Sequence, residues 1–254
     1  MKMKITNNYP LFLPSVVKTY GKDTNIATPS LLIDSKIRLA ETRKALFEMV
    51  EKRYFDQIVI VDGSNTEILT KKEISEFAQK GVIIEQLLFQ QNTLNVSEFG
   101  KSNGEMQIIN YTVTNSVLIK KAGGFTKITP RYVLNNIDKI MPNICNEKNI
   151  FYFYEPSIIP NKNKFVCTIF FKSSLEFYKK YLENSILECE KETHGILESI
   201  FYRKLSKIKT KRIFVEFPHF KGIASTTGNN IKNRYFFARN ISSKSGLLCY
   251  SFKE

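Results

Sequence analysis

The sequence predicts an α/β protein with a mostly parallel central sheet flanked by helices. Apolar strand segments alternate with amphipathic helical segments from residue 30 to residue 129, which is the order of a parallel sheet with helical crossovers. Hydrophobic residues make up 43% and charged residues 24% of the 254-residue chain, as in folded globular proteins. Beyond residue 140 the pattern changes to short strands, polar turns and further helices, which we expect to continue the same domain.

Residues 1–29 lack clear periodicity, so we expect an irregular lead-in. Its apolar patch is short and is interrupted by Pro10 and Pro14, which makes a poor signal peptide. No run of apolar residues approaches the ~18 that a spanning helix needs. The four cysteines include no C-x-x-C pair, which favours a reducing compartment. We therefore expect a cytoplasmic protein, with peripheral contact to the inner face of the plasma membrane left open.

The elements between residues 30 and 129 follow from apolar spacing and from helix caps. Asp34 or Ser35 is placed to cap the first helix, and Thr70 with Glu73 three residues later predicts a capping box at the second. Gly123 and the glycine after it end the third helix. The expected strands are 30–33, 58–61, 82–90 and 125–129, and the expected helices are 34–53, 70–80 and 105–121.

The second half is expected to hold strands over 150–154, 165–171 and 212–216, with helices over 175–187 and 194–205. The tail, 217–254, is basic and rich in Gly, Ser and Asn. We divide the chain into a lead-in (1–29), a first half (30–140) and a second half (141–254) of one domain.

The net charge of +14 favours an anionic partner: a phosphorylated metabolite, a nucleic acid or an acidic membrane surface. The positive residues are scattered, and the densest run, residues 204–212, is short. No zinc-finger, basic-zipper or aromatic RNA-platform signature is present, so sequence-specific nucleic-acid binding is not expected. A non-catalytic module that binds RNA or an anionic membrane remains the alternative to an enzyme.

The strand over 58–61 ends on Asp62, Gly63 and Ser64. In an open parallel sheet, ligands bind beyond the carboxyl ends of the strands. An aspartate there can accept hydrogen bonds from a ribose or a base, and the glycine lets the backbone approach closely. An ordinary Asp-Gly turn is the competing interpretation.

Residues 30–64 and 100–132 together resemble bacterial surface-polysaccharide glycosyltransferases with a GT-A-type fold. The similarity rests on the D-G-S strand end, on a G-x-x-x-G-E segment at 100–105, and on Lys-Ile-Thr-Pro-Arg-Tyr at 127–132, where the family pattern has Gly instead of Pro130. It continues weakly through 168–171, 197–198 and 222–228. The resemblance implies transfer of a sugar from a nucleotide donor, with a uridine diphosphate (UDP) sugar favoured, to a cell-surface glycan or lipid-linked glycan.

The resemblance also implies roles for particular residues. Asp62 would hold the nucleoside, Lys127 and Arg131 the diphosphate, and Glu198 would be the general base of an inverting transfer, with His194 as the alternative. Glu105 is expected in the first turn of its helix, where capping alone would explain it, or in contact with sugar or acceptor. The other expected contacts to the nucleotide sugar are Gly63, Ser64, Lys101, Gly104, Thr129, Tyr132, His219, Ser225, Thr226 and Thr227.

No divalent metal is expected, although Mg²⁺ or Mn²⁺ is not ruled out. The chain has five Asp, and no two are spaced D-x-D, the pair that usually holds the metal in this fold. Lys127 and Arg131 occur where the pair would fall, and cations can stabilise the departing diphosphate themselves. One unit-charge pair at ~4 Å and an effective dielectric of about 20 is worth about 4 kcal/mol. Solvated strand-end cations are the competing interpretation, and a nucleotidyl- or phosphotransferase would need more clustered acids than this chain has.

Overall fold

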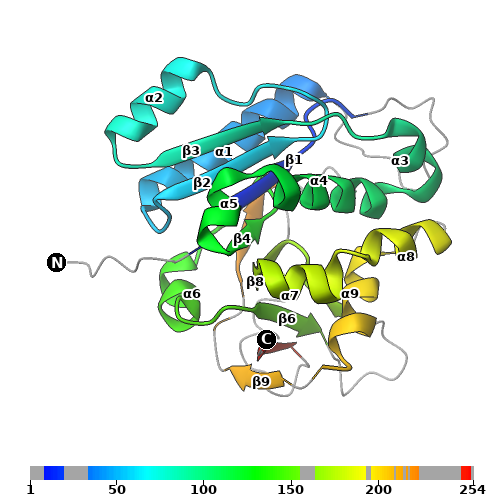
Figure 1. Ribbon diagram of the computed structural model, residues 1–254. Helices are drawn as coiled ribbons and strands as arrows, with labels where there is room; N and C mark the ends of the chain where they lie inside the picture. The colour runs from blue at the N-terminus through cyan, green and yellow to red at the C-terminus, as the bar shows by residue number, and fades with distance from the viewer. Residues whose placement is uncertain are drawn as a thin grey trace.

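A mixed nine-stranded sheet extends through the described part of the chain (Figure 1). This computed structural model describes residues 9–19, 34–154, 164–192, 196–208, 210–213, 216, 218–222 and 247–252. The strand order is β3-β2-β1-β4-β8-β6-β11-β9, with β7 paired to β6. The prediction of an α/β protein with a helix-flanked sheet is confirmed.

The first four strands in this order are parallel, and they form the half of the sheet that carries the candidate site. They are β1 (Leu11–Ser15), β2 (Gln57–Asp62), β3 (Ile83–Leu88) and β4 (Gly124–Ile128). The chain passes from β1 to β2 to β3 on one side and then returns to place β4 on the other side of β1. This reversal makes the carboxyl ends of β1 and β4 the topological switch point, where open α/β sheets bind ligands.

The strands of the second half pair antiparallel, and β8 joins them to β4. They are β6 (Ile150–Tyr154), β7 (Phe165–Val166), β8 (Phe170–Ser174), β9 (Thr210–Ile213) and β11 (Leu247–Phe252). A separate two-stranded sheet pairs β5 (Tyr132–Leu134) with β10 (Phe220–Gly222). The two predicted halves thus share one continuous sheet.

Helices cover both faces of the sheet. They are α1 (Ser35–Lys52), α2 (Lys71–Gln79), α3 (Thr93–Phe99), α4 (Lys101–Asn115), α5 (Val117–Ala122), α6 (Ile137–Ile144), α7 (Leu175–Phe177), α8 (Ser185–Lys191) and α9 (Leu197–Leu205), with a π-helical turn, η1 (Tyr178–Leu182), after α7. One hydrophobic core contains the buried residues of α1, α2 and α6, and a second contains those of α4, α5 and α7–α9. Figure 1 shows α4 and α5 in front of the parallel strands. None of the helices in the described ranges combines the length and the apolar character that crossing a membrane requires.

The expectation of an irregular lead-in is wrong for Leu11–Ser15, which form the fully buried strand β1. Pro14 argues against a strand in the sequence, because proline cannot donate to a sheet ladder. The pairing resolves the conflict. The backbone groups of successive strand residues face opposite neighbours. The carbonyl of Pro10 faces β4 and that of Ser15 faces β2, so the nitrogen of Pro14 faces β4. Pairing with β4 ends at Phe12, so no ladder hydrogen bond is lost at Pro14. The predicted strand over 30–33 lies outside the described residues.

Helix starts are confirmed where a side chain caps the helix locally. The Asp34 carboxylate accepts from the N–H groups of Lys36 and Ile37 at 2.8 and 3.1 Å, and Thr70 and Glu73 form the predicted capping box. Other bounds need correction. The helix expected over 105–121 is α4 and α5, which Ser116 separates and caps.

The remaining corrections lie mostly in the second half. The strand expected over 165–171 is the pair β7 and β8, the helix over 175–187 is interrupted by η1, and the strand over 212–216 is shifted to β9. The basic tail, in which no strand was predicted, supplies β10 and β11.

Candidate active site

Asp62, the last residue of β2, joins the two loops that follow β1 and β2. Its Oδ2 accepts a hydrogen bond from the N–H of Val17 at 2.9 Å, and its Oδ1 accepts from the N–H groups of Ser64 and Thr66 at 2.9 and 3.1 Å. The hydroxyl of Ser64 also donates to Oδ1. Asp62 is 1% exposed, so its carboxylate shapes the carboxyl edge of the sheet through backbone contacts.

Gly63 and Gly104 bring the start of α4 against this edge. A Cβ on Gly63 would lie 2.8 Å from Ile108 Cδ1, and one on Gly104 would lie 2.8 Å from Gln91 Nε2. The same Gln91 nitrogen donates to the Gly104 carbonyl at 2.5 Å. Both glycines therefore pack closely against these side chains, which places the first turn of α4 beside the loops that Asp62 organises.

Three basic residues converge at this edge from different elements, and we call them the cation cluster: Arg38 of α1, Lys101 at the start of α4, and Arg131, which follows β4. Arg38 is buried, and its Nε donates to the carbonyl of Val16, just beyond β1, at 2.8 Å. Arg131 repels Arg38, and both arginines repel Lys101.

Burial and, to a smaller extent, repulsion from Arg131 lower the pKa of Arg38 to about 9, against the attraction of Asp62 and Tyr132. Burial also lowers the pKa of Lys101, again with repulsion from Arg38 and Arg131. Burial also lowers the pKa of Arg131, against the attraction of Tyr132, Glu105 and Glu41. A guanidinium stays protonated in proteins, so the arginines of the cluster keep their positive charge despite burial. A bound anion would offset this charge.

Two donors of the cation cluster are buried without an acceptor. Lys101 Nζ and Arg131 Nε have no hydrogen-bond partner among the residues that the structure describes. A buried donor left unsatisfied costs free energy, and each such group calls for an explanation. A ligand with several acceptor oxygens would satisfy both.

Lys127 lies beside the cation cluster but is already engaged. Its Nζ lies 2.7 Å from Glu105 Oε1 and donates to Thr129 Oγ1 at 3.1 Å and to the Thr168 carbonyl at 2.5 Å. An ammonium has three hydrogens to donate, and the Lys127 side chain is fully buried. In this arrangement Lys127 anchors Glu105 and the β7–β8 segment, while the cation cluster carries the free donors.

Glu105 is a carboxylate that interacts with Arg131 of this cluster. The expectation that it occupies the first turn of its helix is wrong, because α4 begins at Lys101 and its first turn contains no acidic residue. Helix capping therefore does not explain Glu105. Its side chain is 31% exposed, it is paired with Lys127, and its charge raises the pKa of Arg131.

Glu198, near the start of α9, completes a chain of polar contacts across the two halves. Its Oε1 accepts from Thr168 Oγ1 at 2.8 Å, and the Thr168 carbonyl accepts from Lys127. Burial raises the pKa of Glu198, and repulsion from Glu105 raises it further. The N–H of Leu197 donates to Ser102 Oγ at 3.1 Å, so the starts of α9 and α4 meet here.

Of the other predicted residues, Tyr132 lies at the cation cluster and His219 lies just before β10 of the neighbouring two-stranded sheet. Tyr132 is buried and couples electrostatically to Arg38 and Arg131, which puts it at the cation cluster. The backbone of His219 contacts Asn135 and Asn136 beyond β5. His194, Ser225, Thr226 and Thr227 lie outside the described residues.

Sequence reasoning missed Arg38. The buried positions of α1 are Arg38, Thr42, Ala45, Leu46, Met49 and Val50. Arg38 thus occupies the apolar stripe of an amphipathic helix, where a lone cation needs a partner. A charged residue at an apolar position of the helix is therefore the sequence feature that could have identified Arg38.

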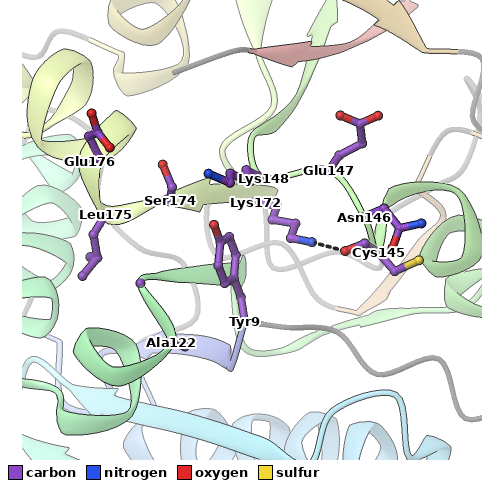
Figure 2. Close-up of a pocket in the computed structure, with 11 residues that line it drawn as sticks. Tyr9, Ala122, Cys145, Asn146, Glu147, Lys148, Lys172, Ser174, Leu175 and Glu176 are labelled. Carbon is purple, nitrogen blue, oxygen red and sulfur yellow. Dashed lines mark hydrogen bonds between the residues drawn. The ribbon is translucent and has the colours of Figure 1, made fainter.

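A cavity of about 490 Å³ lies at the opposite end of β4, and Figure 2 shows the residues that line it. Its buried Lys172 donates to the carbonyls of Ile144 and Cys145 at 3.1 and 2.8 Å, at the end of α6. A cation suits the carbonyl end of a helix, so Lys172 is explained as a cap. None of the predicted site residues lines this cavity.

No group of three or more His, Cys, Asp or Glu that could hold a metal ion occurs in the part of the chain that the structure describes. Comparison with known proteins adds no assignment: no protein-family model matches the chain, and no curated protein matches it.

Proposed function

We propose that this protein is a glycosyltransferase of GT-A-like architecture that transfers a sugar from a nucleotide-sugar donor to a cell-surface glycan or lipid-linked glycan. The observation that carries the proposal is the cation cluster of Arg38, Lys101 and Arg131, with unsatisfied buried donors, at the switch point of the sheet. A diphosphate supplies both the negative charge and the acceptor oxygens that this cluster requires.

Burial of the cation cluster favours a small phosphate ligand over a polymer. The two nitrogen atoms that lack acceptors are inaccessible, whereas RNA or a membrane surface is met by exposed basic side chains. We take UDP as the first nucleotide to test.

In the proposed reaction Glu198 accepts the proton of an acceptor hydroxyl as that oxygen attacks the anomeric carbon. The bond between the anomeric carbon and the diphosphate oxygen breaks, and its electron pair leaves with the nucleoside diphosphate. Arg131 and Lys101 stabilise the charge that develops there. A raised pKa suits a general base that works near neutrality, which is the direction found for Glu198. Glu105, held by Lys127, would orient a sugar hydroxyl.

Thermal unfolding and donor hydrolysis test this proposal. UDP and UDP-sugars should stabilise the protein more than uridine does, and a ligand at 100 times its dissociation constant adds about 2.7 kcal/mol. Release of UDP from the matching UDP-sugar should persist in excess EDTA and should fall about 10²–10³-fold in Arg131→Ala. If no nucleotide, nucleotide sugar or pyrophosphate at millimolar concentration stabilises the wild type, the proposal is wrong. Activity that EDTA abolishes and Mn²⁺ restores would overturn its metal-independent form.

A further inference from the structure

Arg131 has an unusual backbone conformation. Its φ of 79° is positive, a region that residues other than glycine seldom occupy and that costs conformational free energy. Such a conformation persists only where the surrounding structure enforces it. The N–H of Tyr132 donates to the carbonyl of Thr129 at 3.3 Å across this turn, but that bond alone does not fix the peptide after Arg131.

Gly222 lies directly against that peptide. It is paired with Tyr132 across β10 and β5, and a Cβ added to it would lie 2.0 Å from the carbonyl oxygen of Arg131 and 2.9 Å from Tyr132 Cδ1. Its φ of 152° is also positive. Only a residue without a side chain can occupy this place without moving Arg131.

The segment that carries Gly222 is fastened to the chain beyond Arg131. The N–H of Asn135 donates to the carbonyl of His219, and the N–H of His219 donates to Asn136 Oδ1, both at 2.8 Å. Asn136 Nδ2 also donates to Glu216 Oε2 at 3.2 Å. These contacts hold β10 against the segment that follows Arg131.

We propose that Gly222 is a positioning residue, which lets β10 close on the Arg131 peptide and so holds the guanidinium in the cation cluster. The ligand of that cluster rests on the proposed function, whereas the coupling between Gly222 and Arg131 does not. An added methyl group at residue 222 would push the Arg131 carbonyl away and would turn the guanidinium out of the site.

Calorimetric titration of inorganic pyrophosphate separates this role from a general loss of structure. Gly222→Ala should weaken binding at least about 10-fold in the wild-type background. In the Arg131→Gln background it should have less than about a twofold effect, because no guanidinium is left to misplace. In the Lys101→Met background the full effect should remain. Equal weakening in the Arg131→Gln background, or no weakening in the wild type, would overturn the proposal.

Two further measurements cover other outcomes. Asn136→Ala loosens β10 without adding atoms, so it should weaken pyrophosphate binding in the same background-dependent way if Gly222→Ala does not fold.

Urea unfolding without ligand gives a second cycle: Gly222→Ala should lower the midpoint less in Arg131→Gly than in the wild type, since glycine lets the peptide rotate. An equal shift of the midpoint in both backgrounds would refute the coupling between Gly222 and Arg131, and this test does not require pyrophosphate binding. Absence of pyrophosphate binding in the wild type would count against the proposed function and not against the coupling. Gly81→Ala, at a φ of 80° with no atom within 4 Å of its Cβ, is the matched control and should leave pyrophosphate affinity unchanged.

Discussion

Lys127 Nζ lies 2.7 Å from Glu105 Oε1, and this ion pair joins β4 to α4 inside the candidate site. Lys127 is fully buried, while Glu105 is partly exposed. Lys127 therefore makes only internal contacts among the described residues, and its ion pair holds Glu105 beside the cation cluster.

Glu105→Gln should be strongly destabilising because it leaves the buried ammonium of Lys127 without its counter-charge. Removing one partner of a buried pair typically costs about 3 kcal/mol or more in the free energy of unfolding, measured by urea denaturation. The double variant Glu105→Gln, Lys127→Met should recover part of that loss. An unchanged stability in Glu105→Gln would mean that Thr129 and Thr168 satisfy Lys127 by themselves.

Lys101→Met should make the ligand-free protein more stable while weakening its binding of anions. It removes a cation that Arg38 and Arg131 repel, so the urea midpoint should rise. Pyrophosphate affinity should fall about 10- to 100-fold, the range for one hydrogen bond to a charged group. Lys72→Met, at a side chain that is 87% exposed, is the control and should change neither quantity. A fall in both stability and affinity would contradict the idea of unrelieved positive charge.

Glu198→Gln should change stability in a pH-dependent way. Burial raises the pKa of Glu198 above 4.5, so the folded protein binds this proton more tightly than the unfolded chain does, and stability falls as pH rises through the folded pKa. The glutamine variant lacks this loss. Its stability relative to wild type should therefore increase from pH 4 to pH 8, measured by urea denaturation at each pH. The exposed Glu176→Gln should show no such trend, and a flat difference for Glu198→Gln would contradict the prediction.

Glu73→Gln should have the opposite pH dependence. The hydrogen bond from Arg43 and that from the Thr70 N–H lower the pKa of Glu73 to about 2, so its charged form stabilises the fold above the unfolded pKa of 4.5. The advantage of wild type over the variant should shrink as pH falls from 4.5 toward 2. Glu76→Gln serves as the comparison, because Glu76 meets Lys72 only at 4.0 Å on an exposed face. A constant difference for Glu73→Gln would refute this account.

Local signals predicted the parts of the fold that depend on neighbours in sequence. The Asp34 cap, the capping box of Thr70 with Glu73 and the helix end at Gly123 each form within a few residues, so no distant segment is needed to specify them. The strand β2 and its end on Asp62 could be predicted for the same reason, from a short apolar run followed by a turn.

Candidate site residues were found where a polar or basic residue lies at the end of a strand or just after it, as with Asp62, Lys127 and Arg131. Their partners were not predictable in this way. Arg38 reaches the site from the buried face of α1. Thr168, which is 41 residues from Lys127 in the sequence, links Lys127 to Glu198. The strand β1 was missed because the tolerance for Pro14 depends on where pairing with β4 ends.

The alternation of strands and helices, the local caps and the excess positive charge can all be read from the amino-acid order, since each follows from composition or from short-range spacing. The packing of distant segments instead sets which cations lie together, pairs Lys127 with Glu105, and places Gly222 against the Arg131 peptide. Those relationships arise when segments far apart in the chain are packed together, and the burial that follows changes the energy of each charge by an amount that no local pattern contains.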